Sequence, residues 1–222
     1  MRLILVRHGQ TSSNVEGLLD TREPGADLTD LGREQAAALP DVLGAEPIDL
    51  IVTSTLVRTQ QTAAPLADAL GLEPWIRDGV REISAGDYEM RGDPEAVRGY
   101  LEPIFSWRED DLTGRVLGGE NGAEFYERFD GVVDEILATG VRTAVIVSHG
   151  AAIRSWVPAR ADNVSGEFAA RTPVSNTGVV VLEGDRRTGW TVLTWEDQAL
   201  GGPEVDTSLA DGPAGDPVDV DA

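Results

Sequence analysis

The sequence contains no cysteine, and all of its 18 basic residues are arginines. The lack of cysteine excludes a disulfide framework, a thiolate nucleophile and a cysteine-based metal site. The sequence also has no long apolar run, and no stretch approaches the length needed to span a membrane. Histidine is scarce as well, with two copies in the chain. Histidine chemistry, if present, therefore has few candidate residues.

The charge balance restricts the partners of the chain. Acidic residues number 39, so the formal net charge is −21. A field of this sign repels nucleic acid and anionic membrane surfaces, and we expect neither as a partner. A small anionic substrate is compatible with this charge, because several arginines in one pocket make it locally positive and grip phosphate in a bidentate manner.

Length and composition indicate one catalytic domain followed by a tail. A chain of 222 residues with 41 % hydrophobic and 26 % charged residues fits one α/β domain over residues 1–200. Residues 201–222 are rich in glycine, proline and aspartate and contain no basic residue, which predicts a disordered acidic tail. The short apolar start, Met1–Val6, is interrupted by Arg7 and is interpreted as a first strand rather than a signal sequence. A cytoplasmic location is expected on this basis.

Strand-like and helix-like segments alternate along the first part of the chain. Apolar runs at residues 3–6, 49–53 and 73–76 predict strands, and helical spacing predicts one long helix over residues 28–44 and another that Ser54 caps and Gly71 ends. This β-α-β-α-β order favours a mostly parallel sheet with right-handed crossovers. The predicted fold is a three-layer α/β/α sandwich.

The second half continues the pattern after an irregular stretch. Residues 122–138 predict an amphipathic helix, 144–148 a buried strand, and 177–182 with 190–195 a hairpin. Residues 87–119 mix glycine, proline, aromatic residues and arginines, and we interpret them as a small, mostly helical lid inserted in the domain. The alternative is a surface excursion whose aromatic residues pack on the sheet. An edge strand near Trp75 or Trp195 can support pairing with a second copy of the chain, so the sequence is compatible with a homodimer.

The two histidines occur in matching settings. His8 follows the apolar run Leu3–Val6 and stands between Arg7 and Gly9, and His149 follows the run 144–148 and precedes Gly150. In open α/β sheets, ligands bind at the carboxyl ends of the strands, where helix N-termini point N–H groups at anions. Although a single histidine is more often structural, two at two strand ends indicate one site.

Four separated motifs resemble those of the histidine phosphatase superfamily, the phosphoglycerate mutase-like proteins. They are Arg7-His8-Gly9-Gln10-Thr11 with Asn14, the stretch 54–63 with Arg58, the single Glu82, and Ser148-His149-Gly150. The motifs stand in the family's order, and the resemblance spans about residues 2–195.

The resemblance implies a phosphohistidine mechanism without metal or other cofactor. His8 would attack the phosphorus of a small phosphorylated metabolite, and the nearby arginines would favour its neutral form. Glu82 would protonate the leaving alcohol and then take a proton from water. Phosphoryl oxygens would be held by the set Arg7, Arg58, His149, Asn14, Thr21 and the backbone N–H groups near Gly9, Gly150 and Ala151.

Three of these residues, Glu82, Arg58 and Asn14, also have a purely structural interpretation. A glutamate such as Glu82 is commonly an exposed partner of an arginine, here Arg81 or Arg77. Arg58 would be a helix-surface arginine, and Asn14 a helix cap. The clustering of the motifs favours the catalytic interpretation.

Two departures from the family bear on the reaction. Leu18–Gly25 replaces the usual glutamine-glycine stretch, and Ala85–Arg91 is acidic where the mutase branch carries a basic cluster. The sequence therefore resembles the phosphatase branch and predicts a phosphomonoesterase. A phosphoglycerate mutase-type transfer and an inactive phosphate- or protein-binding module are the alternatives.

Overall fold

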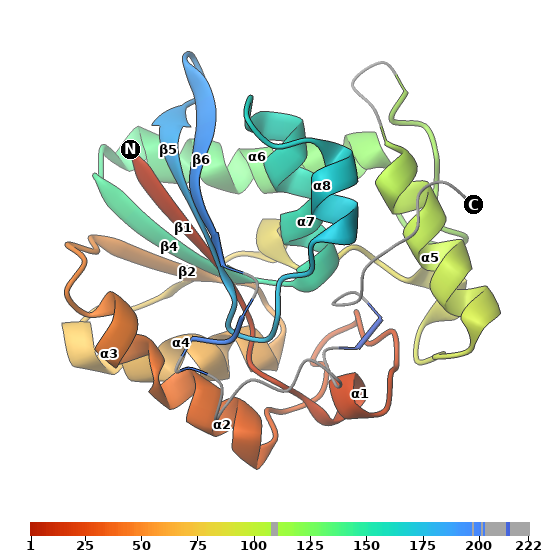
Figure 1. The fold of residues 1–222 in the computed structure, drawn as a ribbon, viewed down its shortest axis with the longest axis horizontal. Coiled ribbons are helices and arrows are strands. Elements are labelled where there is room, and N and C mark those ends of the chain that lie inside the picture. Colours follow the sequence, from red (N-terminus) through yellow and green to blue (C-terminus); the bar gives the residue numbers. More distant parts are fainter. Residues whose placement is uncertain (108–110, 197, 201, 203–211, 214–222) are drawn as a thin grey trace.

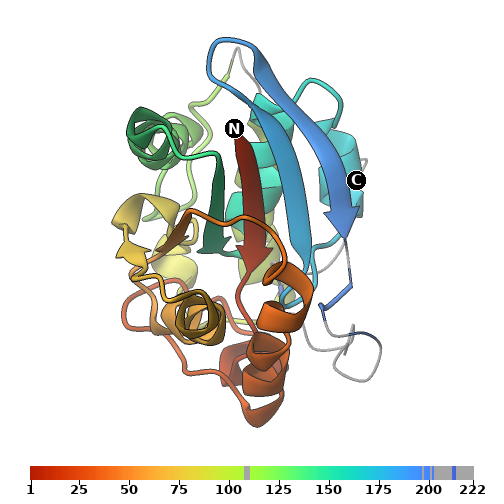
Figure 2. The ribbon, with the colours of Figure 1, turned by 90° about the vertical axis from the view of Figure 1, so that its left-hand side faces the viewer.

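The computed structural model describes residues 1–107, 111–196, 198–200, 202 and 212–213. Its described part is an α/β fold with a six-stranded sheet in the order β3-β2-β4-β1-β5-β6. The strands are β1 (Arg2–Arg7), β2 (Leu50–Thr53), β3 (Trp75–Ile76), β4 (Thr143–Ser148), β5 (Val179–Asp185) and β6 (Gly189–Glu196). β3, β2, β4 and β1 run parallel, and β5 and β6 are antiparallel additions at one edge, as Figure 2 shows.

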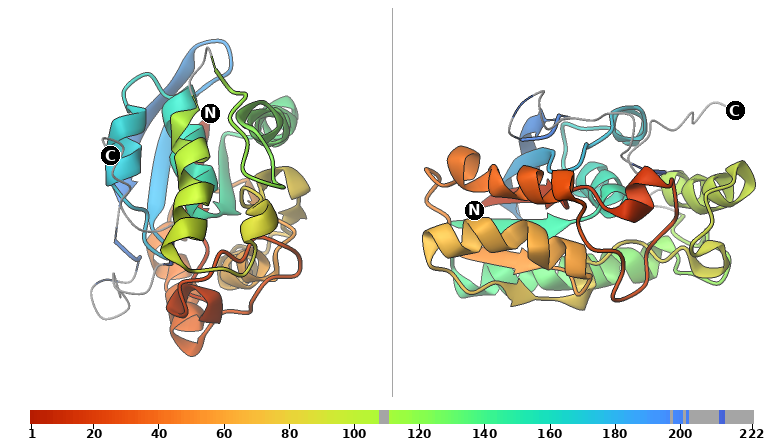
Figure 3. Two further views of the ribbon diagram at one scale, coloured as in Figure 1. Left: turned by 90° about the vertical axis from the view of Figure 1, so that its right-hand side faces the viewer. Right: turned by 90° about the horizontal axis from the view of Figure 1, so that it is seen from below.

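Helices cover both faces of this sheet, which confirms the predicted sandwich (Figure 1). One face carries α2 (Asp30–Ala37), α3 (Leu39–Leu43) and α4 (Val57–Leu70). The other carries α6 (Gly122–Thr139) and α7 (Gly150–Arg160), with α5 (Pro94–Ser106) packed beside α7 (Figure 3). The remaining short elements are α1 (Ser12–Val15), α8 (Gly166–Arg171) and the 3₁₀ turns at Asp78–Val80 and Gly86–Tyr88.

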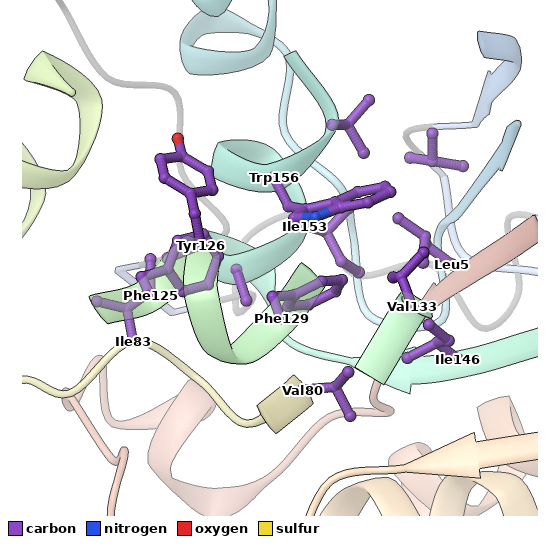
Figure 4. Packing of buried hydrophobic residues seen from close by; sticks show 14 of the residues in the cluster. Leu5, Val80, Ile83, Phe125, Tyr126, Phe129, Val133, Ile146, Ile153 and Trp156 are labelled. Atoms are coloured by element: carbon purple, nitrogen blue, oxygen red, sulfur yellow. The ribbon is translucent and has the colours of Figure 1, made fainter. Parts of the chain in front are cut away.

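Alternation along β1 divides the core in two. Leu3 and Leu5 belong to the cluster under α5, α6 and α7, whereas Ile4 and Val6 belong to the cluster under α3 and α4. The larger cluster contains an aromatic row in which the Phe129 ring centroid lies 5.2 Å from that of Trp156. Figure 4 shows these two rings next to each other. Because successive side chains point to opposite faces, β1 is held rigidly between two packed layers.

Two local predictions need correction. The single helix expected over 28–44 is two helices, α2 and α3, which meet at Ala38 with Pro40 in the first turn of α3. Proline has no N–H and is accommodated best in a first turn, which agrees with a new helix that begins at Leu39. Ser54 is not the N-cap of α4; that position is Leu56, which makes no side-chain cap bond.

Other predicted elements are confirmed with small shifts of their ends. The strand at 73–76 is shorter than expected, and the hairpin is the pair β5 and β6. Trp75 and Trp195 lie on β3 and β6, the two edge strands of the described sheet. Of the segment 87–119, residues 94–106 form α5; the disorder expected for 201–222 lies outside the described residues except for 202 and 212–213. Among the described helices, none combines the length and apolarity needed to cross a bilayer.

Candidate active site

The two histidine motifs meet at the carboxyl ends of two neighbouring strands. β1 and β4 pair in parallel with Arg7 opposite Ser148, so His8 and His149 leave the sheet side by side. Their ring centroids are 5.2 Å apart. The register of one strand pair therefore brings together two residues that lie 141 positions apart in sequence.

A small cavity at this edge collects most of the predicted site residues. It is lined by Arg7, His8, Thr11, Ser13, Asn14, Leu18, Leu19, Asp20, Thr21, Arg58, Glu82, Tyr100, Gly150 and Pro213. The catalytic candidates come from β1, α4 and the loop after β3, and Tyr100 comes from α5. His149, Gly9 and Ala151 are the predicted residues that do not line it.

The surroundings of His8 fix which ring nitrogen can react. Its Nδ1 lies 2.8 Å from the carbonyl oxygen of Gly9. Because a carbonyl only accepts, Nδ1 carries the proton and Nε2 keeps its lone pair. Burial, followed by the positive charges of Arg58 and Arg7, holds the pKa of His8 well below its ordinary value. The imidazole is therefore neutral at physiological pH.

His149 is oriented by a different kind of partner. Its Nε2 lies 2.8 Å from the hydroxyl oxygen of Ser54, which also accepts the backbone N–H of Leu56 and contacts the Thr59 hydroxyl. Its Nδ1 is buried without a hydrogen-bond partner in the described part of the chain. Burial, then the charge of Arg58, lowers the pKa of His149 well below its ordinary value.

Two buried arginines place positive charge beside the histidines. Arg7 donates through Nη1 to the Val174 carbonyl at 2.7 Å. Arg58 donates through Nη2 to the Asp20 carbonyl at 2.8 Å, and its Nη1 lies 3.8 Å from the Asp20 carboxylate. Among described atoms, Arg58 Nε and Nη1 find no hydrogen-bond acceptor. Since buried donors in native proteins are normally paired, these two indicate a position for an anion.

Glu82 is not an exposed salt-bridge partner of Arg77 or Arg81, as the structural interpretation of the sequence would have it. The residue is 4 % exposed, while Arg77 pairs with Glu135 and Arg81 with Asp78 and Glu120. Burial raises the pKa of Glu82 above its ordinary value, against backbone N–H groups and Arg58, which lower it. The carboxyl group of Glu82 therefore keeps its proton to a higher pH than an exposed glutamate does.

The carboxyl oxygens of Glu82 are held unequally. Oε1 accepts the N–H groups of Ile83 and Ala152, both at 2.9 Å, whereas Oε2 accepts that of Ala151 at 3.2 Å. Oε2 is thus the oxygen with the greater free capacity to carry a proton.

An arginine outside the predicted set braces the loop that carries Glu82. Arg128 on α6 donates to the carbonyls of Gly79, Arg81 and Glu82 at 2.7, 2.9 and 3.1 Å. It also holds the Glu120 carboxylate through Nε at 2.8 Å and Nη2 at 2.7 Å. A short strand, β3, and a 3₁₀ turn precede Glu82, so this bracing supplies order that regular structure does not.

Three predicted phosphate donors are engaged elsewhere in this structure. The N–H of Gly9 donates to the Thr62 hydroxyl at 2.9 Å, and that of Ala151 donates to Glu82. The hydroxyl of Thr21 donates to Glu89 and accepts the N–H of Ala85. Thr21 lines the cavity, but the donors expected from these three residues do not point to an open phosphate position. Partners 53 to 69 positions away in sequence, which a motif does not reveal, use them.

Asn14 has both of the roles that the sequence suggested, a place at the candidate site and a place in a helix cap. It lines the cavity and is also the third residue of a capping box on α1, whose N-cap is Thr11. The structure adds Asn176, which donates to the His8 carbonyl at 2.9 Å from the loop before β5. The sequence signal for Asn176 is weak, a Ser-Asn-Thr-Gly turn preceding a strand, and sequence reasoning missed it. Ser54 directly follows β2, which ends at the same edge of the sheet as the two histidine strands. This position is the sequence signal for its contact with His149.

Comparison with known proteins assigns the family. The histidine phosphatase superfamily (branch 1) matches residues 3–198. The PE-PGRS family protein PE_PGRS11 of Mycobacterium tuberculosis is 36 % identical over 220 residues, covering 92 % of this chain and 38 % of that protein. The glucosyl-3-phosphoglycerate phosphatase of Mycolicibacterium vanbaalenii is 33 % identical over 214 residues, covering 91 % of this chain and 88 % of that enzyme. This chain belongs to branch 1 of the histidine phosphatase superfamily.

A solved structure of the same family agrees with the fold. The native structure of a mycobacterial glucosyl-3-phosphoglycerate phosphatase superposes with a TM-score of 0.73 at 29 % identity, covering 88 % of this chain and 98 % of that one. The resemblance identified from the motifs is thereby confirmed, as is the phosphatase branch. This histidine phosphatase is a hydrolase of phosphoric monoesters by family.

Proposed function

We propose that this histidine phosphatase hydrolyses small phosphorylated metabolites through a phosphohistidine on His8, without a metal. The observation that carries the proposal is the contact between His8 Nδ1 and the Gly9 carbonyl, which leaves the Nε2 lone pair for phosphorus. Neutral imidazole is the nucleophilic form, and burial with the two arginines favours it.

In the first step, His8 Nε2 forms a bond to phosphorus while the ester P–O bond breaks. Glu82 Oε2 transfers its proton to the departing alcohol oxygen. The negative charge spread over the phosphoryl oxygens is stabilised by Arg7, Arg58 and the Nδ1–H of His149. The two arginines supply the positive charge that a metal ion supplies in other phosphatases, and neutral His149 adds a hydrogen bond, so the step requires no metal.

In the second step, water attacks the phosphorus of the phosphohistidine. Glu82, now a carboxylate, accepts a proton from the water, and the P–N bond breaks to return neutral His8 and release inorganic phosphate. One carboxyl group serves both half-reactions because the leaving alcohol and the attacking water occupy the same side of the phosphoryl group.

The substrate class follows the relatives and the cavity. A phosphorylated sugar or glycerate derivative is favoured, since two relatives of which the chain covers 88 % and 85 % are glucosyl-3-phosphoglycerate phosphatases; other relatives covered to 74 % and 92 % carry the name phosphoserine phosphatase. The segment Ala85–Arg91 supports hydrolysis over mutase transfer: Glu89 holds Thr21, and the side chain of Arg91 pairs with Asp93. A second substrate anion thus finds no uncommitted cation in this segment.

The test is a burst experiment with 4-nitrophenyl phosphate in excess chelator. Nitrophenolate leaves without a proton, so Glu82→Gln should still form the phosphohistidine but hydrolyse it slowly, by about 10²- to 10⁴-fold. Glu82→Gln should therefore release a burst of about one nitrophenolate per chain and accumulate an acid-labile phosphoprotein, and His8→Ala should show neither. Glu135→Gln, which alters an exposed carboxylate paired with Arg77, is the matched control and should turn over normally.

Two results would contradict the proposal. Phosphate release by His8→Ala at the parent rate would exclude the phosphohistidine, and loss of activity in chelator would exclude the metal-free mechanism. Transfer of the phosphoryl group to added phosphoglycerate instead of water would support the mutase alternative. No burst and no turnover with any ester would leave the binding-module alternative.

A further inference from the structure

Side chains from other elements hold the backbone of the loop that carries Glu82. Each carbonyl over residues 79–83 accepts a hydrogen bond from one of them. The pairs are Gly79, Arg81 and Glu82 with Arg128 of α6, Val80 with Ser148 of β4, and Ile83 with Tyr100 of α5. A single 3₁₀ turn offers these carbonyls few N–H partners, so the side-chain donors determine the path of the loop.

Arg128 commits its whole guanidinium group to this loop and to one carboxylate. Its Nη1 donates to the carbonyls of Gly79 and Arg81. Its Nη2 donates to the Glu82 carbonyl and to Glu120 Oε1, and its Nε donates to Glu120 Oε2. Every N–H of the guanidinium therefore has an acceptor, and the planar shape of the group fixes the direction of each bond.

Glu120 holds the other side of the same loop. Its side chain is 8 % exposed, and its Oε1 accepts the N–H of Ser84 at 2.9 Å as well as Nη2 of Arg128 at 2.7 Å. Arg128 thus holds the carbonyl side of the loop and Glu120 holds its N–H side, while the two side chains are bonded to each other. Because a charge-assisted pair with two hydrogen bonds is strong and directional, this Arg128–Glu120 clamp holds the backbone around Glu82 as one unit.

The clamp acts on the backbone of the loop rather than on the substrate. Neither Arg128 nor Glu120 is among the described residues that line the cavity with Glu82. The N–H of Ile83, inside the clamped stretch, donates to Glu82 Oε1 at 2.9 Å, and the side chains of Val80 and Ile83 pack in the larger core cluster (Figure 4). A shift of the loop would therefore move the carboxyl group together with one of its donors. Proton transfer needs hydrogen-bond reach, and a misplacement of about 1 Å can cost about 10²-fold in rate.

We propose that the Arg128–Glu120 clamp positions Glu82 to transfer its Oε2 proton to the departing alcohol oxygen. Arg128 and Glu120 are thus positioning residues, and they matter most for esters whose alcohol leaves only with a proton, as in sugar and glycerate phosphates. Loss of the clamp slows cleavage of those esters and leaves an ester with an acidic leaving group nearly unaffected. The inference rests on the proposed role of Glu82, and its test distinguishes a failure of the clamp from a failure of that role.

The test compares kcat/KM for phenyl phosphate with kcat/KM for 4-nitrophenyl phosphate. Nitrophenolate leaves without a proton, whereas the more basic phenolate leaves faster when an acid protonates it. Because kcat/KM includes only the steps up to cleavage of the P–O bond, hydrolysis of the phosphohistidine does not affect it. The ratio of the two values therefore measures proton donation by Glu82.

Arg128→Gln removes the forked donor of the clamp. It should lower kcat/KM about 10- to 100-fold for phenyl phosphate and less than about threefold for 4-nitrophenyl phosphate. The matched control is Arg160→Gln, which breaks another arginine pair of α6, that with Asp130 at 2.7 Å, and should change neither value by more than about twofold. Equal losses with both esters in Arg128→Gln, or no loss with either, would overturn the proposal.

Arg128→Lys separates the charge of the clamp from its geometry. The lysine keeps the positive charge, but one ammonium group cannot reach the loop carbonyls and both oxygens of Glu120. This variant should stay at least about fivefold below the parent with phenyl phosphate. Full recovery would assign the effect to charge and overturn the positioning role.

Glu120→Gln carries the test if thermal unfolding shows that Arg128→Gln is not folded. It keeps an oxygen for the Ser84 N–H but removes the charge from the pair with Arg128. It should lower kcat/KM for phenyl phosphate alone, by about three- to tenfold. A loss with both esters or with neither would count against the clamp.

Glu82→Gln separates this inference from the proposed function. It should lower kcat/KM for phenyl phosphate about 10²- to 10⁴-fold and leave that for 4-nitrophenyl phosphate nearly unchanged. Without this selective loss, the proposed role of Glu82 and the clamp fail together. A selective loss in Glu82→Gln with none in Arg128→Gln would overturn the clamp alone.

Discussion

The ends of β1 and β4 are built alike and differ in one contact. Each strand leads into a histidine followed by a glycine, and the two are in register in a parallel pair. His8 contacts a backbone carbonyl through Nδ1, and His149 contacts the Ser54 hydroxyl through Nε2. The opposite nitrogen of each ring is thus the one left for a substrate.

The chemistry of the two partners explains the division of roles. A carbonyl can only accept, so His8 is held in one tautomer with a lone pair on Nε2. A hydroxyl donates or accepts, so Ser54 can donate to His149 Nε2 and leave a proton on Nδ1. The first arrangement suits a nucleophile, and the second suits a hydrogen-bond donor to the phosphoryl group.

Replacing each histidine by alanine should separate these roles most strongly. His8→Ala removes the attacking atom, and we expect kcat to fall by at least about 10⁴-fold. His149→Ala removes one donor to the transition state, and we expect a loss of about 10²- to 10³-fold. Steady-state rates with 4-nitrophenyl phosphate measure both.

Phosphoprotein trapping supplies the control for this pair. His149→Ala should still form an acid-labile phosphoprotein, and His8→Ala should form none. Labelling of His8→Ala but not of His149→Ala would reverse the assignment.

The sequence predicted this pair of strand ends well, but it did not predict their hydrogen bonds. The parallel sheet and the pairing of His8 with His149 followed from strand ends, because the fold places such ends at one edge, whereas Arg58 and Glu82 followed from the resemblance to the family. The N–H groups of Gly9 and Ala151, which the resemblance implies as phosphate donors, bond in this structure to Thr62 and Glu82, acceptors that lie far away in sequence.

The missed positions share the same physical origin. Arg128 reaches Glu82 from α6, and Pro213 reaches the cavity from beyond the sheet. Such contacts depend on three-dimensional packing and leave no periodic pattern in the sequence. The break of the predicted long helix beside Pro40 agrees with proline chemistry, but Pro65, Pro103 and Pro158 lie inside α4, α5 and α7, so the proline alone does not predict it.

The charge beside both histidines offers a second way to compare them. After burial, Arg58 is the largest cause of the lowered pKa of His8 and of His149. Arg58→Gln removes this positive charge, so protonation of His8 becomes easier and its pKa rises. The active form is neutral, and activity is lost as pH falls through that pKa; the acid limb of kcat/KM should therefore move to higher pH.

This variant should also lose about 10- to 100-fold in kcat/KM at its optimum, because a phosphate donor is lost. The alkaline limb, if it belongs to Glu82, should also move to higher pH, because the charge of Arg58 lowers the pKa of that carboxyl group as well. Arg77→Gln, which removes an exposed arginine paired with Glu135, is the control and should leave the profile unchanged. An acid limb that stays fixed or moves to lower pH in Arg58→Gln would contradict the charge argument.

The smallest expected effect tests the contact that distinguishes the two strand ends. Ser54→Ala removes the hydroxyl that orients His149, and a hydrogen bond of about 1 kcal/mol corresponds to about a fivefold loss in kcat. Ser54→Thr keeps a hydroxyl and should recover most of this loss, which a purely structural role would not require. The same change at Ser106, an exposed serine bonded to Pro103, should have no effect. Because His8 keeps its carbonyl partner in Ser54→Ala, the burst of phosphohistidine formation should persist at reduced rate; loss of the burst would mean that His149 and His8 share one hydrogen-bond system rather than two.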